Sequence, residues 1–486
     1  MAAVVVLAVL QAAATSSADD LIFDFDHQQQ CGHMMVGQLL LLGESQRRQQ
    51  QHEHIEGSFT SLEVVSLGAP NNGALPTMKT DDPFASEPHV RPCRNPFLWP
   101  FAADSVWNTP IGSSAAYSPA HIYNDSFLSK DRGPPVKFHN DQDWIVRAQL
   151  SDPLTPWIND AGQFPGGCAA KQSKGRPPAP PIHFPASLVT DCTGNNNAAA
   201  ILLPDNKTLL QTQPLYRPAK GGPLISWYHA GAPQDFPWEI DITSGDTPTL
   251  QSALGSHGGS GISGIGGTIR LGELLNKTGP ILHALKLELW SGPYYFGGVP
   301  NLQNGKCAPW SPPYAAGGTD CVPSGGRNQY VWPAIGSDSG SQEGGKLYFG
   351  QDRFLAPGAL LAIPPSLSGT LGLTTPVAAK IEQALTDFGG YLVDDTGAKA
   401  GGAALCMEPG VSDEVVEAYG PQQDFHIQNA VKPGTPLYAD LLKIYRSLAV
   451  VTNNKPGSIG GGGKKRRPPP PPFCTEYYSA RPQGID

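Results

Sequence analysis

The sequence predicts a mainly β fold, a β-sandwich or jelly-roll-like domain with two or three accessory helices. Glycine and proline are abundant, with 56 and 49 residues among 486, which is typical of many turns and short irregular segments. Short apolar segments bounded by Gly or Pro recur along the chain, among them PLISWYHAG, HALKLELW, GKLYFG and GALLAIP. Short strands with such turn punctuation favour a sandwich or a related β fold.

Local patterns predict a hairpin and two helices. The stretch AAAILLPDNKTLLQTQPLY contains two apolar runs around a Pro-Asp-Asn-Lys turn, as in a hairpin. In TPVAAKIEQALTDFGGYLVDD, Thr375 is a candidate N-cap, Pro376 lies in the first turn, and Gly389 and Gly390 form the stop. PLYADLLKIYRSLAVV repeats the helical pattern, and each helix is expected to cover a sheet face or edge.

The chain divides into four parts by composition. Residues 1–18 resemble a signal peptide, with an apolar run and A-x-A-like sites ending at Ala14 or Ala18. Residues 19–90 are Gln-rich and predict a low-complexity or propeptide extension. Residues 91–456 form the expected β-rich globular domain. Residues 457–486, which include PGSIGGGGKKRRPPPPPF, predict a linker or a stiff polyproline tail.

Charge and compartment signals exclude several classes of partner. The net charge of −9 provides no concentrated basic surface, so nucleic acid is not an expected partner. The N-terminal apolar run is too short to span a bilayer, so no membrane span is expected. Glycosylation sequons begin at Asn124, Asn206 and Asn276 and fit a secretory route. The expected location is secreted, extracellular or associated with the cell wall.

The eight cysteines are expected to form disulfides. They include no C-x-x-C pair and do not alternate with His at zinc-ligand spacing. Local pairs Cys168–Cys192 and Cys307–Cys321 would each close a proline-rich loop, and Cys93 with Cys474 would tie the two ends of the folded region together. With a disulfide role open to each cysteine, no cysteine hydrolase is predicted.

A glycine-rich stretch, GSHGGSGISGIGGTIRLGEL, occupies residues 255–274. Gly259, Gly261 and Gly264 have the G-x-G-x-x-G spacing of a dinucleotide-binding loop. The residues before it are polar and turn-rich, and those after it resemble a strand, whereas the motif requires a strand before and a helix after. No cofactor is therefore predicted, and we expect the glycines to form a ligand-facing turn.

Aromatic and acidic side chains point to a sugar ligand, because aromatic faces pack on the C–H faces of a pyranose and carboxylates accept its hydroxyls. Glu239 and Asp241 would share one face of a strand, and a second carboxylate such as Asp394 would come from elsewhere. A lyase would instead need a base and a cation, for which His257 and Arg270 have the right side chains. The candidate catalytic residues are His257, His229, Glu239, Asp241, Arg270 and Asp394, and the candidate substrate-binding residues are Trp107, Asn108, Trp227, Tyr228 and Trp238.

Structural roles are the alternatives for several of these residues. Arg270 could pair with Glu273 across a turn, Lys286 could lie on a solvated strand face, and Asp394 could cap a turn. A metal site through His229, Asp241 and His257 lacks any compact ligand spacing, so no metal is predicted.

Five segments in this order, FAADSVWNTPI, HGGSGISGIGGTIRLGEL, HALKLELW, GALLAIPPS and ALTDFGGYLVDDTG, resemble a family of secreted, largely uncharacterised microbial proteins. The resemblance spans residues 95–463 and implies a secreted setting and a glycan context, because some members carry carbohydrate-binding modules. Together with the residues above, it predicts a secreted enzyme that cleaves an extracellular polysaccharide, as a glycoside hydrolase or polysaccharide lyase. The alternative is a non-catalytic glycan-binding or cell-wall matrix protein; the oligomeric state stays open.

Overall fold

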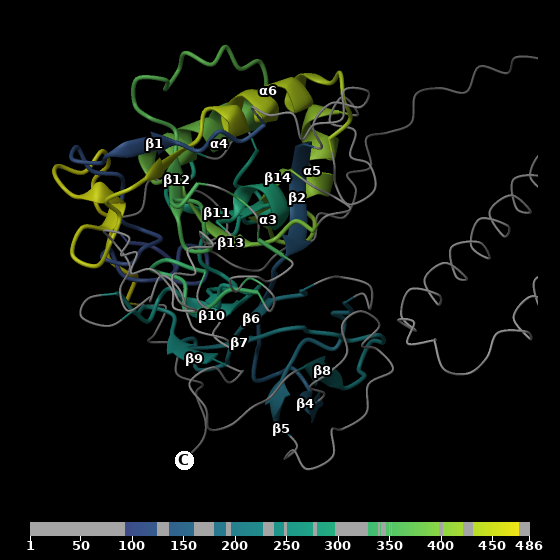
Figure 1. The fold of residues 1–486 in the computed structure, drawn as a ribbon. Helices are drawn as coiled ribbons and strands as arrows, with labels where there is room; N and C mark the ends of the chain where they lie inside the picture. The colour runs from purple at the N-terminus through teal and green to yellow at the C-terminus, as the bar shows by residue number, and fades with distance from the viewer. Residues whose placement is uncertain are drawn as a thin grey trace, which may run out of the picture. The chain divides into compact units, whose positions relative to one another are not determined.

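A seven-stranded mixed sheet is the largest element of the fold (Figure 1). The computed structural model describes residues 93–123, 136–159, 179–190, 196–226, 238–246, 250–275, 279–296, 329–338, 341, 347–348, 350, 352–397, 402–420 and 431–475, which all belong to one compact unit, Thr80–Asp486. The strand order is β1-β15-β12-β13-β11-β14-β2. These strands are β1 (Tyr117–Pro119), β2 (Val136–Gln142), β11 (Leu285–Leu289), β12 (Leu360–Ala362), β13 (Gly390–Asp394), β14 (Ala403–Met407) and β15 (Ala449–Val451).

Two smaller sheets complete the described β structure. One has the order β3-β6-β7-β9 and the other β5-β4-β8. The strands are β3 (Trp144–Arg147), β4 (Leu154–Asn159), β5 (Ala179–His183), β6 (Ala199–Leu202), β7 (Thr208–Thr212), β8 (Leu224–Ser226), β9 (Trp238–Asp241) and, outside these sheets, β10 (Leu254–His257). Strands β6 and β7 pair antiparallel as the predicted hairpin. The mainly β prediction is confirmed, whereas a sandwich or jelly-roll topology stays a prediction.

The helices of the described residues are α3 (Ser291–Tyr294), α4 (Pro376–Asp387), α5 (Val411–Tyr419) and α6 (Pro436–Arg446), with a 3-10 turn η4 (Ile459–Gly461). The Thr375 side chain accepts a hydrogen bond from the Ala378 amide, and the Thr435 side chain accepts one from Tyr438. Each hydroxyl satisfies an amide that the helix itself cannot bond, which fixes where α4 and α6 begin. None of the helices in this part of the chain combines the length and the apolar character that a membrane crossing needs.

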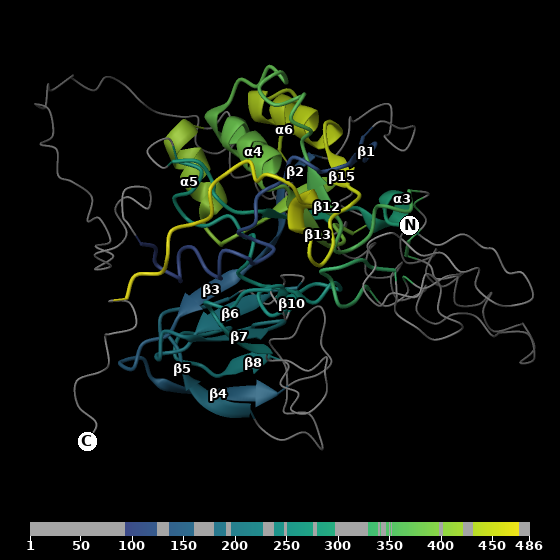
Figure 2. The same ribbon diagram turned by 90° about the vertical axis from the view of Figure 1, so that its left-hand side faces the viewer.

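The elements form layers, as Figure 2 shows. The helices α4, α5 and α6 cover one face of the seven-stranded sheet, and the smaller sheets lie on the side of its other face. Alternation along β11 explains both faces. Leu285, Leu287 and Leu289 join the apolar core under the helices. Lys286 and Glu288 point the opposite way and are nevertheless fully buried, because the four-stranded sheet covers that face. A strand of alternating character is therefore buried on both sides.

Residues 457–475 pack against the beginning of the described domain. Cys93 and Cys474 form a disulfide across 381 residues of sequence, which confirms that predicted pairing. The Arg94 amide donates to the Pro472 carbonyl at 2.8 Å, and the Gly112 amide donates to Gly460 at 2.9 Å. The segment is thus a strap on the domain and not a solvated linker. The predicted Cys168–Cys192 and Cys307–Cys321 pairs lie outside the described residues.

Candidate functional site

Ionisable side chains gather on the inner face of the seven-stranded sheet, between that sheet and strand β10. Strand β11 contributes Lys286 and Glu288, and β14 contributes Cys406, while the leucines next to them face the helices. The remaining members come from the ends of β2, β10 and β13. We call the set of Asp141, Asp143, His257, Lys286, Glu288, Asp394 and Cys406 the buried centre, because no member is more than 4% exposed.

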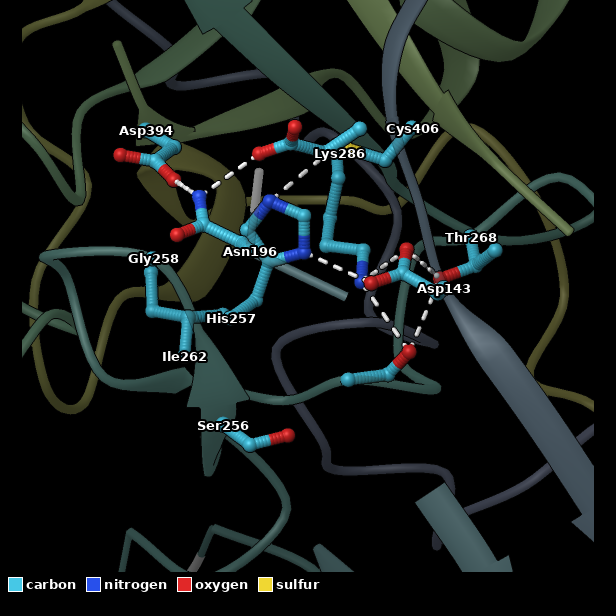
Figure 3. Close-up of polar contacts among 12 residues, drawn as sticks. Asp143, Asn196, Ser256, His257, Gly258, Ile262, Thr268, Lys286, Asp394 and Cys406 are labelled. Carbon is cyan, nitrogen blue, oxygen red and sulfur yellow. Dashed lines mark hydrogen bonds and ion pairs between the residues drawn. The ribbon is translucent and has the colours of Figure 1, made fainter. Parts of the chain in front are cut away.

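His257 lies in the middle of the buried centre (Figure 3). Its Nδ1 is 2.7 Å from Asp143 Oδ1. Its Nε2 faces the other way, 3.7 Å from Cys406 Sγ and 3.6 Å from Glu288 Oε1. Burial acts to lower the pKa of His257, but the charge of Asp143, the nearby Cys406 and the hydrogen bond to Asp143 together outweigh it, and the pKa stands well above its ordinary value. Asp143 therefore fixes both the orientation and the charge of this ring.

The Asp143 carboxylate contacts the Lys286 ammonium, the His257 ring and the Thr268 hydroxyl of this region. Lys286 Nζ lies 2.8 Å from Asp143 Oδ2, and Thr268 Oγ1 donates to the same oxygen at 2.8 Å. Lys286 also donates to the carbonyls of Ser263 and Gly264, so the buried ammonium has three acceptors. Burial alone would raise the pKa of Asp143, but Lys286 and His257 hold it below its ordinary value. Asp143 is thus held in the ionised form.

Two further carboxylates share one amide donor. Asn196 Nδ2 donates to Asp141 Oδ2 at 2.7 Å and also to Asp394 Oδ2 (Figure 3). Burial, with Glu288 nearby, raises the pKa of Asp141 to about 7. Burial, together with Asp338 and Asp141, raises the pKa of Asp394 well above its ordinary value. Like charges held together in a buried place favour the protonated form, so these two carboxyls differ in character from Asp143.

Asp338 extends this line of carboxyl groups to the surface. Its side chain is half-buried, and Tyr348 Oη donates to Asp338 Oδ2 at 2.7 Å. Burial raises its pKa, although the hydrogen bond from Tyr348 opposes the shift. We call Asp141, Asp394 and Asp338 the carboxyl row. It runs from the interior to a position that solvent reaches.

Glycines make room for the row. A Cβ on Gly258 would overlap the carboxyl group of Asp394, and a Cβ on Gly259 would overlap that of Asp338. Gly258 also has a φ of +55°, a conformation that favours glycine. The expected glycine-rich turn therefore faces carboxyl groups of the protein itself, and two consecutive glycines are required where they approach.

Burial sets the state of the thiol. It raises the pKa of Cys406 well above its ordinary value, although His257 opposes the shift. Cys406 Sγ lies 3.2 Å from Glu288 Oε1 and is the only free cysteine within the described residues. The prediction that each cysteine has a disulfide role is wrong for Cys406.

The structure separates the predicted catalytic residues into two groups. His257 and Asp394 meet in the buried centre. Glu239 and Asp241 lie on β9, an edge strand of the four-stranded sheet, where Asp241 Oδ1 accepts from Thr243 and Oδ2 is 3.4 Å from Lys207 Nζ. In the described contacts neither acid touches His257 or Asp394, because their strand is the outer one of the sheet.

Trp107, Asn108 and Arg270 line a narrow crevice with about 10 Å³ of space, barely enough for one water molecule. The indole N–H of Trp107 donates to the Ser252 carbonyl, and the Asn108 amide donates to three carbonyls of residues 100–102. Arg270 Nε is 2.9 Å from Glu408 Oε2, while its own amide donates to Glu273. These polar groups are engaged with the protein, so the crevice is a structural junction. Thr268 also lines it and links it to Asp143.

For the other predicted site residues the described part of the chain provides no side-chain contacts. His229, Trp227 and Tyr228 lie outside the described residues, and Trp238 is the first residue of β9. The alternative reading of Lys286 as a residue on a solvated strand face is wrong, because a second sheet covers that face.

Several residues of the site escaped the sequence analysis: Asp141, Asp143, Asn196, Glu288, Asp338 and Cys406. The available signal was the strand HALKLELW, where Lys286 and Glu288 alternate with leucines. Alternation of this kind is typical of a sheet with one solvent-exposed face. Only the position of the second sheet shows that the polar face of this strand is buried.

We expect Gly267→Ala to destabilise the protein more than Gly272→Ala. Both glycines have positive φ, +75° and +84°, so both substitutions carry the backbone penalty of about 1–3 kcal/mol. A Cβ on Gly267 also meets Trp107 Cζ3 at 2.5 Å, whereas one on Gly272 has no atom within 4 Å. Overpacking adds about 1–3 kcal/mol at Gly267 alone. Urea unfolding measures the difference; equal costs would show that Trp107 yields to the added methyl group.

Comparisons with known proteins add no relative: no protein-family model, no curated protein and no solved structure matches this chain.

Proposed function

We propose that this chain is a secreted carbohydrate-active enzyme that cleaves an extracellular polysaccharide by general acid/base chemistry at the carboxyl row. The observation that carries the proposal is the shared donor of Asn196, which holds Asp141 and Asp394 together beside His257. Asp338 brings the same line of carboxyls to a half-buried position, where a substrate meets it. The secreted setting rests on the signal-like N-terminus and on the family resemblance of the sequence.

Glycoside hydrolysis suits such an assembly. One carboxylic acid protonates the leaving oxygen, while a second carboxylate activates water or attacks the anomeric carbon. In this protein Asp338 and Asp394 are the two carboxyls nearest the Gly258–Gly259 turn, and Asp141 lies behind them as a buried neighbour. Backbone without side chains at this turn packs directly against the two carboxyls and fixes their positions. We assign the acid and base roles to Asp394 and Asp338.

Elimination is the second candidate, because His257 is a possible base for proton abstraction next to a uronate carboxylate. Its Nε2 is directed at Cys406 and Glu288, however, and away from the ionised Asp143. A non-catalytic glycan binder needs an aromatic platform on the surface. Trp107 and Trp157 are 1% and 3% exposed and belong to the core, so neither contributes to such a platform.

The test uses the secreted full-length protein and a panel of neutral and uronate-containing polysaccharides. New reducing ends without ultraviolet absorbance are the expected result and identify hydrolysis. Reducing ends together with absorbance of unsaturated products would replace hydrolysis by elimination. If neither signal appears while the protein is retained on a glycan column, the enzyme proposal is overturned and a binding protein remains.

A further inference from the structure

We infer that the buried centre binds a divalent transition metal ion, Zn²⁺ by its chemistry, through His257 Nε2, Cys406 Sγ and Glu288 Oε1. The inference goes beyond the proposed function and does not depend on it, since a metal site can be measured without any substrate.

The three atoms form a compact triangle. Nε2 and Sγ are 3.7 Å apart, Nε2 and Oε1 are 3.6 Å apart, and Sγ and Oε1 are 3.2 Å apart. Zinc takes its ligands at about 2.0–2.3 Å in tetrahedral geometry, which separates neighbouring ligand atoms by about 3.3–3.8 Å. The two distances from Nε2 match this separation and the Sγ–Oε1 distance is slightly shorter, so the triangle is close in size to one face of a zinc tetrahedron. Asp141 and Asp394 offer the fourth ligand, because each has an oxygen within 4.8 Å of a His257 ring nitrogen.

A second observation is independent of these distances. Glu288 is fully buried, and its other carboxylate oxygen, Oε2, has no hydrogen-bond partner within the described part of the chain. An uncompensated buried carboxylate oxygen is costly, because the group has lost its hydration. A cation bound to this carboxylate would compensate the loss, and no described side chain does so for Oε2.

The surroundings of His257 match those of a metal ligand. Histidine ligands commonly donate the second ring N–H to a carboxylate, which fixes the tautomer and directs the other nitrogen at the metal. Asp143 Oδ1 occupies that position 2.7 Å from Nδ1.

The donor set selects the ion. Thiolate and imidazole ligands favour Zn²⁺ or Co²⁺, whereas Mg²⁺ and Ca²⁺ require mostly oxygen ligands. Binding replaces the Cys406 proton, and any proton on His257 Nε2, by the metal, and these protons leave to solvent. No bond to carbon changes and no redox partner is needed.

The test measures metal binding to the purified full chain. The chain is first dialysed against a chelator, and Zn²⁺ is then added back and the excess removed. We expect one equivalent of Zn²⁺ per chain by elemental analysis, retained in the presence of excess Mg²⁺, and a sulfur-to-cobalt charge-transfer absorption when Co²⁺ replaces Zn²⁺. The absorption requires a thiolate ligand, and its loss in Cys406→Ala identifies that ligand as Cys406.

Variants locate the ligands. Glu288→Gln and Cys406→Ala should weaken Zn²⁺ binding at least as much as loss of an outer partner does, about 10–100-fold. Glu382→Gln is the matched control, because Glu382 is also a buried glutamate but lies on α4, on the opposite face of the seven-stranded sheet, where it accepts from the Gly369 amide. The inference is overturned if the folded native chain retains no Zn²⁺, or if Co²⁺ binds without the sulfur absorption. Equal affinities of Glu288→Gln and Glu382→Gln would remove Glu288 from the site.

Discussion

Replacing Asp143 by alanine should lower the free energy of unfolding by about 3–5 kcal/mol, the cost of breaking a buried ion pair by removing one partner. The substitution leaves Lys286 buried with only the carbonyls of Ser263 and Gly264. It also deprives His257 Nδ1 and the Thr268 hydroxyl of their acceptor. Urea unfolding of the native chain and of Asp143→Ala, followed by circular dichroism, measures the loss.

A double-mutant cycle separates the ion pair from packing. Lys286→Met removes the ammonium but keeps an unbranched apolar side chain in its place. Because the two residues are in contact, we expect the double variant to lose less stability than the sum of the single losses, by about 0.5–3 kcal/mol. Additive losses, or a cost below about 1 kcal/mol for Asp143→Ala, would show that the pair does not stabilise the fold.

Removal of the Cys93–Cys474 disulfide is the other change with a large expected effect. The bond closes a loop of 381 residues, and loss of a native disulfide typically costs about 2–5 kcal/mol. Beside the bond, the Cys474 amide donates to Arg94 and the Arg94 amide donates to Pro472. The double variant Cys93→Ala/Cys474→Ala should therefore unfold at lower denaturant concentration than the native chain.

Chemical reduction gives an independent control for this prediction. Treating the native chain with a reductant should lower its stability at least as much as the double substitution does. The double variant should lose less stability on reduction than the native chain, because it no longer contains this bond. If the midpoints of unfolding agree with and without the bond, the hydrogen bonds of the strap hold it without help from the disulfide.

Features of the fold that depend on neighbouring residues could be predicted from the sequence. Thr375 before Pro376 fixes the start of α4 through a hydrogen bond three residues away, and the β6–β7 hairpin depends on the turn between its strands. The sequence predicts a linker for the strap, residues 457–475, because its glycines and prolines are typical of linkers. Its anchor, the contact of Gly460 with Gly112, spans most of the chain and leaves no local signal.

The buried centre was accessible to sequence reasoning only in part. His257 is a candidate because of its residue type and its glycine surroundings, and Asp394 because a second carboxylate is needed. Glu288 and Cys406 are not predicted as site residues, because a carboxylate in an alternating strand indicates a solvent-exposed face and a cysteine indicates a disulfide. Both become informative once β11 and β14 lie side by side under a second sheet. Long-range pairing of strands, and not residue type, assembles this site.

The measurement that tests the proposed function most directly compares Asp394→Asn with Asp241→Asn on the polysaccharide that the native chain cleaves. Asp394 belongs to the carboxyl row, whereas Asp241 lies on the outer strand β9. With both variants folded by circular dichroism, Asp394→Asn should lose about 10²–10⁴-fold in the rate of cleavage, as expected for loss of a general acid or base. Asp241→Asn should keep the native rate. The opposite order, or full activity in Asp394→Asn, would contradict the assignment of the carboxyl row.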